Sequence, residues 1–400
     1  MLYRSLTKNG EKVSLLGYGC MRLPNKRGNI DKELAFEQMR YAYDNGVNYY
    51  DTAYFYHGGK SEGILGEFVK RNDIRDKIYI ADKLPFALTN KTGSIINIFN
   101  NQLKRLDTEY IDFYLMHALG SFANWERLKE LGVVEFIAEK KQSGQIKNIG
   151  FSFHGKQEEF MKIIEDYEWD FCQIQYNYLD VNYQAGRAGL ARAKELGIGV
   201  IVMEPLRGGA LAAKAPEAVL KLLQEKEGKK SAAYWALRFV MNHEGIGTVL
   251  SGMNDVKHIA ENIAVASVTT ENSMSDYEHG VIDEVTAIYK ELMKVPCTGC
   301  NYCMPCPAGI EIPSIFSQYN SKYFFGKNKM RETQYIARSV GLIGGKKMGA
   351  NVCIKCGKCV SKCPQFIDIP TMLQEAHKDF DNKLLRGAMT IAAKFVPKQK

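Results

Sequence analysis

The chain has 400 residues, of which 46% are apolar and 24% are charged, a balance typical of a globular protein with a sizeable core. It contains no run of about 18 apolar residues, which excludes a membrane-spanning helix, and its charged N-terminus lacks a signal-peptide core. The net charge of +8 is spread along the chain, which favours a solvated basic surface over a nucleic-acid-binding patch. We therefore expect a cytoplasmic protein that binds neither nucleic acid nor membrane.

Up to about residue 255, short apolar runs alternate with longer segments of helical period. The predicted strands are Leu15–Cys20, Val47–Thr52, Lys77–Lys83, Ile111–His117, Ile146–Ser152, Phe171–Tyr176, Gly199–Glu204 and Gly247–Gly252. The helices predicted between them include Asp31–Asn45, Ser61–Lys70, Thr92–Leu106, Asn124–Ser143, Gly186–Leu196 and Ser231–Asn242. Eight strand-then-helix units of this length are typical of an α/β (β/α)8 TIM barrel. A doubly wound open sheet is the alternative, but the Gly-rich phosphate loop expected after its first strand is missing.

A closing helix is predicted over Met274–Lys294, and the character of the sequence then changes at a cysteine-rich region. The predicted domains are therefore a barrel over residues 1–294, a small iron–sulfur domain over 295–380 and a helical C-terminal tail over 381–400.

Eight of the ten cysteines lie in two groups of four. They are Cys297, Cys300, Cys303 and Cys306 in the first group, and Cys353, Cys356, Cys359 and Cys363 in the second. Clustered cysteines in a chain without a secretion signal are more often metal ligands than disulfides. Two structural zinc sites are the alternative, but zinc usually takes two CxxC pairs separated by a longer loop. Two CxxCxxC triplets, each followed by a Cys-Pro, favour iron–sulfur clusters.

This region resembles the bacterial-type ferredoxins, in which the cysteine before the proline ligates the other cluster. The resemblance implies two 4Fe–4S clusters, one held by Cys297, Cys300, Cys303 and Cys363, and the other by Cys353, Cys356, Cys359 and Cys306. The first group is one residue short of the ferredoxin spacing before its last cysteine. Both groups are followed by a Pro-x-x-Ile-x-Ile-Pro pattern, over 307–313 and 364–370, which predicts that a helix begins at each second proline.

In a β/α barrel the chemistry lies at the C-terminal ends of the strands. The second predicted strand ends near Asp51, with Tyr56 in the following loop, and the third and fourth end in Lys83 and His117. A Tyr hydroxyl is a poor proton donor at neutral pH unless its anion is stabilised, which a neighbouring Lys ammonium can do. An Asp keeps that Lys charged, and a His can orient a carbonyl oxygen. The set is therefore suited to carbonyl reduction.

The segment from Asp51 to Gly66 also resembles the signature of the aldo/keto reductase family, and the resemblance extends over about residues 3 to 290. It implies that Asp51, Tyr56, Lys83 and His117 form the family's catalytic tetrad. It further implies that Ser152 and Gln173, with Tyr176 nearby, hold the nicotinamide. The adenosine phosphate half would bind at Ser251, Gly252, Met253, Lys257, Glu261 and Asn262.

Residues Gly252 and Met253 stand where the family commonly has a Lys and a hydroxyl residue that grip the 2′-phosphate of NADP. The choice between NADP and NAD as cofactor therefore stays open. Two functions follow. One is an NAD(P)H-dependent reductase of a small aldehyde or ketone, with an appended iron–sulfur electron-transfer domain. The other is an electron-transfer protein in which the barrel is a docking scaffold and the clusters pass electrons between redox partner proteins.

Overall fold

The computed structural model describes residues 1–226, 230–325, 329–342 and 347–393. The chain divides into two compact units, one of residues 1–206 with 233–282 and the other of residues 207–232 with 283–400. Residues 207–232, which the sequence analysis assigned to the barrel, thus group with the second unit. The boundary at residue 294 remains a prediction. In the described part of the chain, no helix has both the length and the apolar character needed to cross a bilayer.

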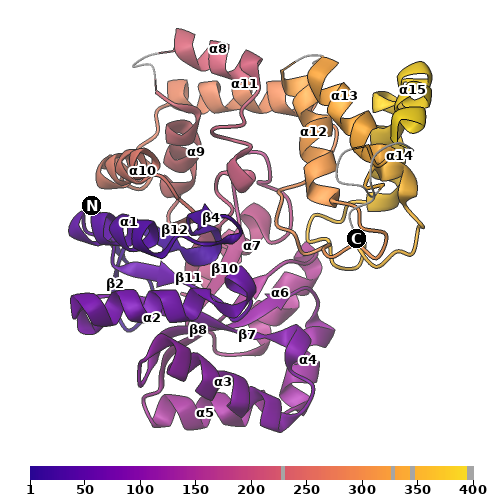
Figure 1. Cartoon of the computed structure of the whole chain (residues 1–400). Coiled ribbons are helices and arrows are strands. Elements are labelled where there is room, and N and C mark those ends of the chain that lie inside the picture. The colour runs from indigo at the N-terminus through magenta and orange to yellow at the C-terminus, as the bar shows by residue number, and fades with distance from the viewer. Residues whose placement is uncertain (227–229, 326–328, 343–346, 394–400) are drawn as a thin grey trace. The chain divides into compact units, whose positions relative to one another are not determined.

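The first unit is built on a closed barrel of eight parallel strands (Figure 1). All eight predicted strands are present, and they pair in chain order around the barrel. They are β3 (Leu16–Gly19), β6 (Tyr49–Asp51), β7 (Tyr79–Pro85), β8 (Ile111–Leu119), β9 (Ile146–Phe153), β10 (Phe171–Gln175), β11 (Gly199–Met203) and β12 (Ile246–Ser251). The sequence therefore predicted the (β/α)8 architecture correctly.

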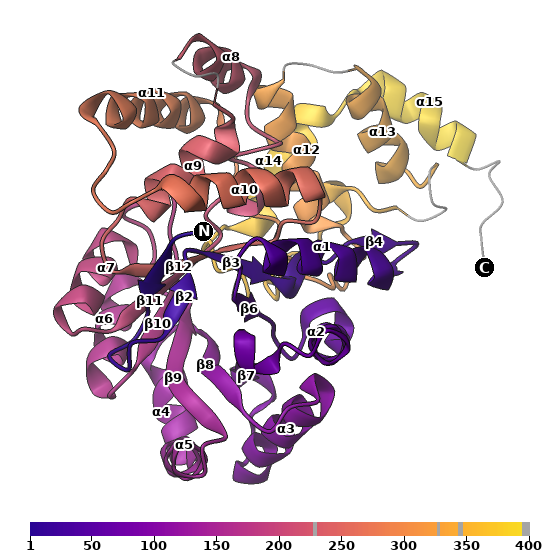
Figure 2. The same ribbon diagram turned by 90° about the vertical axis from the view of Figure 1, so that its left-hand side faces the viewer.

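Helices surround these strands on the outside of the barrel (Figure 2). They are α1 (Lys32–Asp44), α2 (Ser61–Asn72), α3 (Thr92–Leu106), α4 (Phe122–Glu130), α5 (Val133–Gln142), α6 (Gln157–Asp166), α7 (Gly186–Glu195), α9 (Ala232–Met241) and α10 (Val256–Val268). The single helix predicted over Asn124–Ser143 is wrong, because the chain breaks into α4 and α5 at Gly132. Gly132 has a φ of 81°, a left-handed conformation that ends a helix and that glycine adopts without strain.

An antiparallel hairpin of β1 (Tyr3–Ser5) and β2 (Lys12–Ser14), which the sequence analysis did not predict, precedes the barrel. Its Leu6 and Val13 are buried in one cluster with Tyr49 and Phe171, the first residues of β6 and β10. The hairpin therefore closes the N-terminal end of the barrel. A second short hairpin consists of β4 (Asn25–Lys26) and β5 (Asn29–Ile30).

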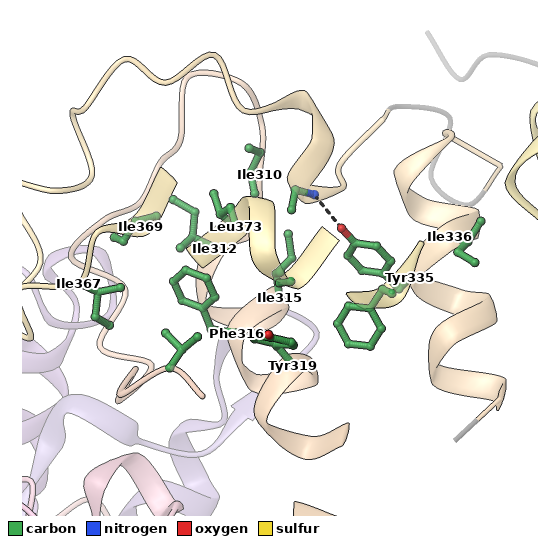
Figure 3. Packing of buried hydrophobic residues seen from close by; sticks show 14 residues of the cluster. Ile310, Ile312, Ile315, Phe316, Tyr319, Tyr335, Ile336, Ile367, Ile369 and Leu373 are labelled. Carbon is green, nitrogen blue, oxygen red and sulfur yellow. Dashed lines mark hydrogen bonds between the residues drawn. The ribbon is translucent and has the colours of Figure 1, made fainter. Parts of the chain in front are cut away.

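The second unit is helical in its described part and has its own hydrophobic core (Figure 3). Its helices are α8 (Glu217–Glu225), the C-terminal part of α11 (Asp276–Leu292), α12 (Ile312–Phe324), α13 (Lys329–Ser339), α14 (Ile369–Phe380) and α15 (Lys383–Ala393). As predicted, α12 and α14 each carry a proline, Pro313 and Pro370, in the first turn. Proline is favoured there because the first turn leaves backbone N–H groups without helical partners.

The repeated Ile-x-Ile pattern explains how this core forms. Ile310 and Ile312 after the first cysteine group, and Ile367 and Ile369 after the second, are all buried in the same cluster. Complete burial of one such side chain contributes about 1.5–3 kcal/mol. The two cysteine segments are therefore held together by apolar packing behind them as well as by any ligand between them. Tyr335 of α13 stacks on Phe380 of α14 at 4.6 Å between ring centroids.

Helix α15 lies within the predicted tail, whose residues 394–400 are outside the described part of the chain. Its Leu385 and Met389 pack against the core of the second unit, whereas Leu384 and Ile391 are exposed. The described part of the tail is thus one amphipathic helix with only one of its faces against the core.

Candidate active site and metal centres

Three neighbouring strands bring ionisable side chains to one end of the barrel. Asp51 is the last residue of β6 and pairs with Ala81 of β7. Lys83 lies two residues further along β7, and Pro85 at the end of β7 pairs with His117 of β8. Because parallel strands all end at the same rim, these residues converge at the C-terminal mouth.

Asp51 and Lys83 form a buried ion pair, in which the Lys83 Nζ lies 2.6 Å from the Asp51 Oδ1. The same ammonium donates to the carbonyl oxygen of Thr52 at 2.6 Å, so two acceptors fix its position. Burial raises the pKa of the Asp51 carboxyl, and the charge and hydrogen bond of Lys83 oppose that rise. Asp51 and the Thr52 carbonyl therefore hold the Lys83 ammonium at a defined place inside the mouth.

Tyr56 lies in the short 3₁₀ turn Tyr56–Gly59 that follows β6. Its ring centroid is 5.1 Å from the Lys83 Nζ, and the ring of His117 meets it edge-on with 6.2 Å between centroids. The structure thus brings together all four predicted tetrad residues. Burial, followed by the charge of Asp51, raises the pKa of the Tyr56 hydroxyl well above its usual range. Tyr56 consequently carries its proton at neutral pH.

His117 is buried two residues before the end of β8. Burial lowers the pKa of its imidazole well below the usual value, and the charge of Lys83 and the neighbouring His154 add to that decrease. At neutral pH the ring is therefore uncharged and carries one N–H donor.

The lowered pKa of His117 leads to a prediction about how the free energy of unfolding depends on pH. The unfolded chain binds a proton at this side chain as the pH falls below about 6.5, whereas the folded chain does so only at lower pH. Protonation therefore favours the unfolded state, and the stability that the neutral ring allows is lost as the pH falls. We expect His117→Gln to gain stability relative to the unmodified protein by up to about 1.4 kcal/mol per pH unit below pH 6.5. Urea unfolding between pH 7 and 5 measures the free energy of unfolding of both proteins. If this free energy changes with pH equally in both, the prediction is wrong.

Two further buried carboxyl groups, those of Asp82 and Glu62, lie near this site, and the sequence analysis did not identify them as candidate site residues. Asp82 and Glu62 are both completely buried, and Glu62 accepts a hydrogen bond from the Arg105 Nη1 at 2.7 Å. Burial, and then the charge of Glu62, raise the pKa of the Asp82 carboxyl well above its usual range. Asp82, directly before Lys83, therefore holds its proton more tightly than a solvent-exposed carboxyl does. Asp82 and Lys83 are consecutive on the strand, so their side chains point to opposite faces. The sequence did not indicate that the Asp82 side chain would contact Glu62 of α2.

The next strands place Ser152 and Gln173 side by side, because these two residues are register partners on β9 and β10. Ser152 Oγ accepts a hydrogen bond from the backbone N–H of Ala118 at 2.7 Å. Gln173 is buried, and its Oε1 has no hydrogen-bond partner among the described residues. A buried acceptor without a partner is unfavourable by about 1–3 kcal/mol. The Gln173 Oε1 therefore lacks a hydrogen-bond donor among the described residues, and a ligand with an N–H group would supply one.

The end of β12 and helix α10 form the other predicted part of the cofactor site. Asn262 donates its Nδ2 to the Ser251 Oγ at 3.0 Å and lies 3.5 Å from the Met253 Sδ, so these three buried side chains form one cluster. Lys257 is exposed in the first turn of α10, and Glu261 is half-buried one turn later. The structure thus brings together Ser251, Met253 and Asn262, with Lys257 and Glu261 on the same helix.

Gly252 reveals a residue that the sequence analysis missed. A side chain at Gly252 would meet the methylenes of Arg22 at 2.9–3.2 Å, so Arg22 lies directly over this glycine. Arg22 is exposed, and it has no ion pair or hydrogen bond with any described residue. The next residue, Leu23, donates its backbone N–H to the His57 Nε2 at 3.1 Å, which ties the segment to the loop of Tyr56. No sequence pattern links Arg22 to Gly252.

Tyr176 is placed differently from the other predicted cofactor residues. Its ring stacks on Phe239 of α9 at 6.1 Å between centroids, and its hydroxyl lies 3.1 Å from the His243 Nε2. Both its ring and its hydroxyl are therefore engaged by helix α9 and the loop after it.

In the second unit, the eight predicted cysteine ligands lie around two hollows. The first hollow is lined by Cys297, Cys300, Cys303 and Cys363. The second is lined by Cys306, Cys353, Cys356 and Cys359, and Cys303 also reaches it. The lining brings Cys363 to the first group and Cys306 to the second, which is the exchange that two-cluster ferredoxins show. Each hollow therefore brings four cysteine thiols together, which is the number of ligands that a 4Fe–4S cluster takes.

A closed parallel barrel with an Asp, a Tyr, a Lys and a His at its mouth, followed by eight clustered thiols, defines a redox enzyme with an iron–sulfur domain. The profile of the aldo/keto reductase family matches residues 15–287, and a 4Fe-4S dicluster domain matches residues 296–367. The chain therefore belongs to the aldo/keto reductase family and carries a ferredoxin-like 4Fe–4S domain at its C-terminus.

Similar proteins agree with this assignment. An uncharacterized oxidoreductase of Bacillus subtilis (strain 168), YrpG, is 29% identical over 242 residues, 54% of this chain and 69% of that protein. The L-galactose dehydrogenase of Arabidopsis thaliana is 25% identical over 307 residues, 71% of this chain and 93% of the relative. Among solved structures, the holo form of the aldo-keto reductase AKR11C1 from Bacillus halodurans superposes with a TM-score of 0.59 at 25% identity, over 71% of this chain and 96% of that one.

A structure of the Klebsiella pneumoniae aldo-keto reductase in complex with NADPH shares the fold, with a TM-score of 0.58 at 19% identity. The match covers 72% of this chain and 96% of that one. In each of these comparisons the similarity leaves more than a quarter of the chain unmatched.

Proposed function

We propose that the barrel reduces a small aldehyde or ketone with a hydride from NADPH or NADH. The observation that carries this proposal is the convergence of Tyr56, Lys83, Asp51 and His117 at the barrel mouth, with the Lys83 Nζ 2.6 Å from Asp51 and 5.1 Å from the Tyr56 ring. These groups supply a proton donor, a fixed positive charge and a neutral hydrogen-bond donor, which carbonyl reduction requires.

The dinucleotide supplies the hydride when it is bound. The Tyr56 hydroxyl donates its proton to the oxygen of the carbonyl as negative charge develops there. The Lys83 ammonium, held by Asp51 and the Thr52 carbonyl, stabilises the tyrosinate left behind. The neutral His117 ring donates its N–H to the same substrate oxygen and orients it.

The residues at the mouth fit a nicotinamide. A carboxamide N–H₂ would donate to the Gln173 Oε1, the buried acceptor that has no partner among the described residues. Ser152, its neighbour across the strands, would contact the same group. Ser251, Gly252, Met253, Lys257, Glu261 and Asn262 would border the adenosine phosphate half. Tyr176 would then support this wall through its contacts with α9.

Arg22 gives the prediction that tests the dinucleotide site. We expect its guanidinium to pair with a phosphate of the cofactor, because its methylenes cover Gly252 and no described acidic residue engages it. A charge-assisted hydrogen bond contributes about 1.5–3 kcal/mol. Arg22→Ala should therefore raise KM for the dinucleotide at least about tenfold, with kcat almost unchanged. Lys26→Ala, which removes an exposed charge from the neighbouring β4, should change neither value. Equal KM for Arg22→Ala and the unmodified enzyme would exclude this role.

The C-terminal clusters are proposed to transfer single electrons in addition to stabilising their unit. Eight cysteines line the two hollows, and in this proposal each hollow holds one 4Fe–4S cluster. Each cluster takes up one electron at a time. A cytoplasmic location belongs to the same proposal, because thiols remain reduced there.

The function is tested by anaerobic consumption of NADPH and NADH by the iron-replete protein across a panel of small aldehydes and ketones. Carbonyl-dependent consumption supports a reductase. Absence of consumption with every carbonyl would contradict it and would favour the barrel as a docking scaffold for electron transfer.

A further inference from the structure

The two cysteine segments of the second unit differ sharply in charge. The first segment, residues 297–310, contains no Asp, Glu, Lys or Arg. The second, residues 351–366, contains Lys355, Lys358 and Lys362 and no acidic residue. The ferredoxin-like ligand pattern requires none of these lysines, since each occupies a variable position between cysteines.

All three lysines line the second hollow, together with its four cysteines. The first hollow is lined instead by neutral residues, among them Thr298, Asn301 and Phe316. A cluster bound in the second hollow would therefore have three positive charges around it, and a cluster in the first would have none in its lining.

This part of the surface is also open. Residues 354–358 are all exposed, including Cys356, as are Lys362 and Val360. Ile354 is 66% exposed and therefore presents an apolar side chain among the lysines. An apolar centre with a charged rim is the usual composition of a transient protein interface. We refer to residues 354–362 as the lysine face.

No described residue neutralises this face. Lys355, Lys358 and Lys362 have no ion pair or hydrogen bond with any described residue, whereas Lys322 in the same unit contacts Asp379 at 2.8 Å. Unpaired exposed charges of one sign increase the rate at which a partner of opposite charge associates, by about 10- to 1,000-fold at low salt.

Building on the proposed electron-transfer role, we propose that the lysine face docks an acidic one-electron carrier protein. One electron would pass from the reduced centre of that carrier to the oxidised cluster that Cys306, Cys353, Cys356 and Cys359 would hold in the second hollow. The carrier is oxidised by one electron, the cluster is reduced by one electron, and no bond is formed or broken. Positive charge beside a cluster favours its reduced state, so the same lysines stabilise the electron where it arrives.

The experiment uses the full, iron-replete chain and a purified flavodoxin of low isoelectric point as the probe. Anaerobic stopped-flow mixing measures the rate at which reduced flavodoxin bleaches the clusters, at several salt concentrations. The test variant is Lys355→Gln/Lys358→Gln/Lys362→Gln. The control is Lys104→Gln/Lys221→Gln/Lys290→Gln, which removes the same charge from exposed positions on α3, α8 and α11.

We expect the test variant to react at least about tenfold more slowly at low salt and to lose most of the salt dependence, while the control reacts like the unmodified protein. Binding of oxidised flavodoxin, measured by calorimetry, should weaken in the same variant. This second readout separates docking from a change in cluster potential. Lys355→Gln and Lys362→Gln singly replace the triple variant if it loses iron.

Equal rates and equal binding for the test variant and the control would overturn the lysine face as a docking site. Reduction of the clusters by dithionite but not by flavodoxin would overturn the docking proposal and leave electron transfer standing. Clusters that accept no electron from either reductant would overturn electron transfer itself. Displacement of flavodoxin by a DNA oligonucleotide that binds more tightly to the same lysines would assign the face to nucleic acid and overturn the proposal.

Discussion

Tyr56→Phe is expected to lower kcat for carbonyl reduction by about 10²- to 10⁴-fold, the usual contribution of a positioned general acid. The change removes one oxygen atom and leaves the ring in place, so the contacts of the Tyr56 ring with Lys83 and His117 should persist. Because the raised pKa keeps the hydroxyl protonated, the lost group is a proton donor rather than an anion. The measurement is the anaerobic, carbonyl-dependent oxidation of NADPH or NADH under saturating conditions.

Tyr50→Phe is the matched control. It makes the same chemical change on the adjacent strand β6, where the hydroxyl donates to the carbonyl oxygen of Met39 in helix α1. Its kcat should equal that of the unmodified enzyme. A Tyr56→Phe enzyme that retains most of its activity and its dinucleotide affinity would assign proton donation to another group, and the role given to His117 would then have to change.

The sequence predicted the convergence at the barrel mouth because the topology determines it. Parallel strands place their C-terminal residues on one rim, so Asp51, Lys83 and His117 were expected to meet once the apolar runs had been recognised as consecutive strands. The exchange of Cys306 and Cys363 between the two hollows was predicted from the resemblance to two-cluster ferredoxins, in which the cysteine before the proline ligates the other cluster.

Contacts that depend on side-chain packing between distant segments could not be predicted in this way. Arg22 covers Gly252 because the segment after β3 lies beside the end of β12, where Tyr18 pairs with Ser251. The absence of a side chain at Gly252, which looked like a missing phosphate-binding residue, is what leaves room for Arg22. Similarly, Asp82 of β7 interacts with Glu62 of α2, and neither residue carried a sequence signal for that contact.

The break at Gly132 illustrates a different limit. Residues 124–143 have an apolar period compatible with one helix, and a single glycine within such a pattern is normally tolerated at about 1 kcal/mol. In the structure Gly132 adopts a left-handed conformation, and Leu128 and Val133 are both buried on either side of the bend. A local pattern can therefore identify helical residues without determining where the chain turns.

Cys363→Ala is expected to remove the same cluster as Cys297→Ala, although the two residues lie in different cysteine motifs. Both line the first hollow, whereas Cys353, Cys356 and Cys359, which precede Cys363 in its own motif, line the second. Each variant should lower the iron content from about eight atoms per chain to about four or fewer. Iron analysis and the electron paramagnetic resonance spectrum of the reduced protein measure this result.

The spectra decide the ligand assignment more sharply than the iron content does. If Cys363 ligates the first cluster, the signal that survives in Cys363→Ala should match that of Cys297→Ala and differ from that of Cys356→Ala. A match with Cys356→Ala would show that each motif holds its own cluster, and the exchange inferred from the two hollows would be wrong. Cys172→Ala is the control, because Cys172 is a buried core residue of β10. Its iron content and spectrum should remain those of the unmodified protein, since its thiol lies in the barrel wall and lines neither hollow.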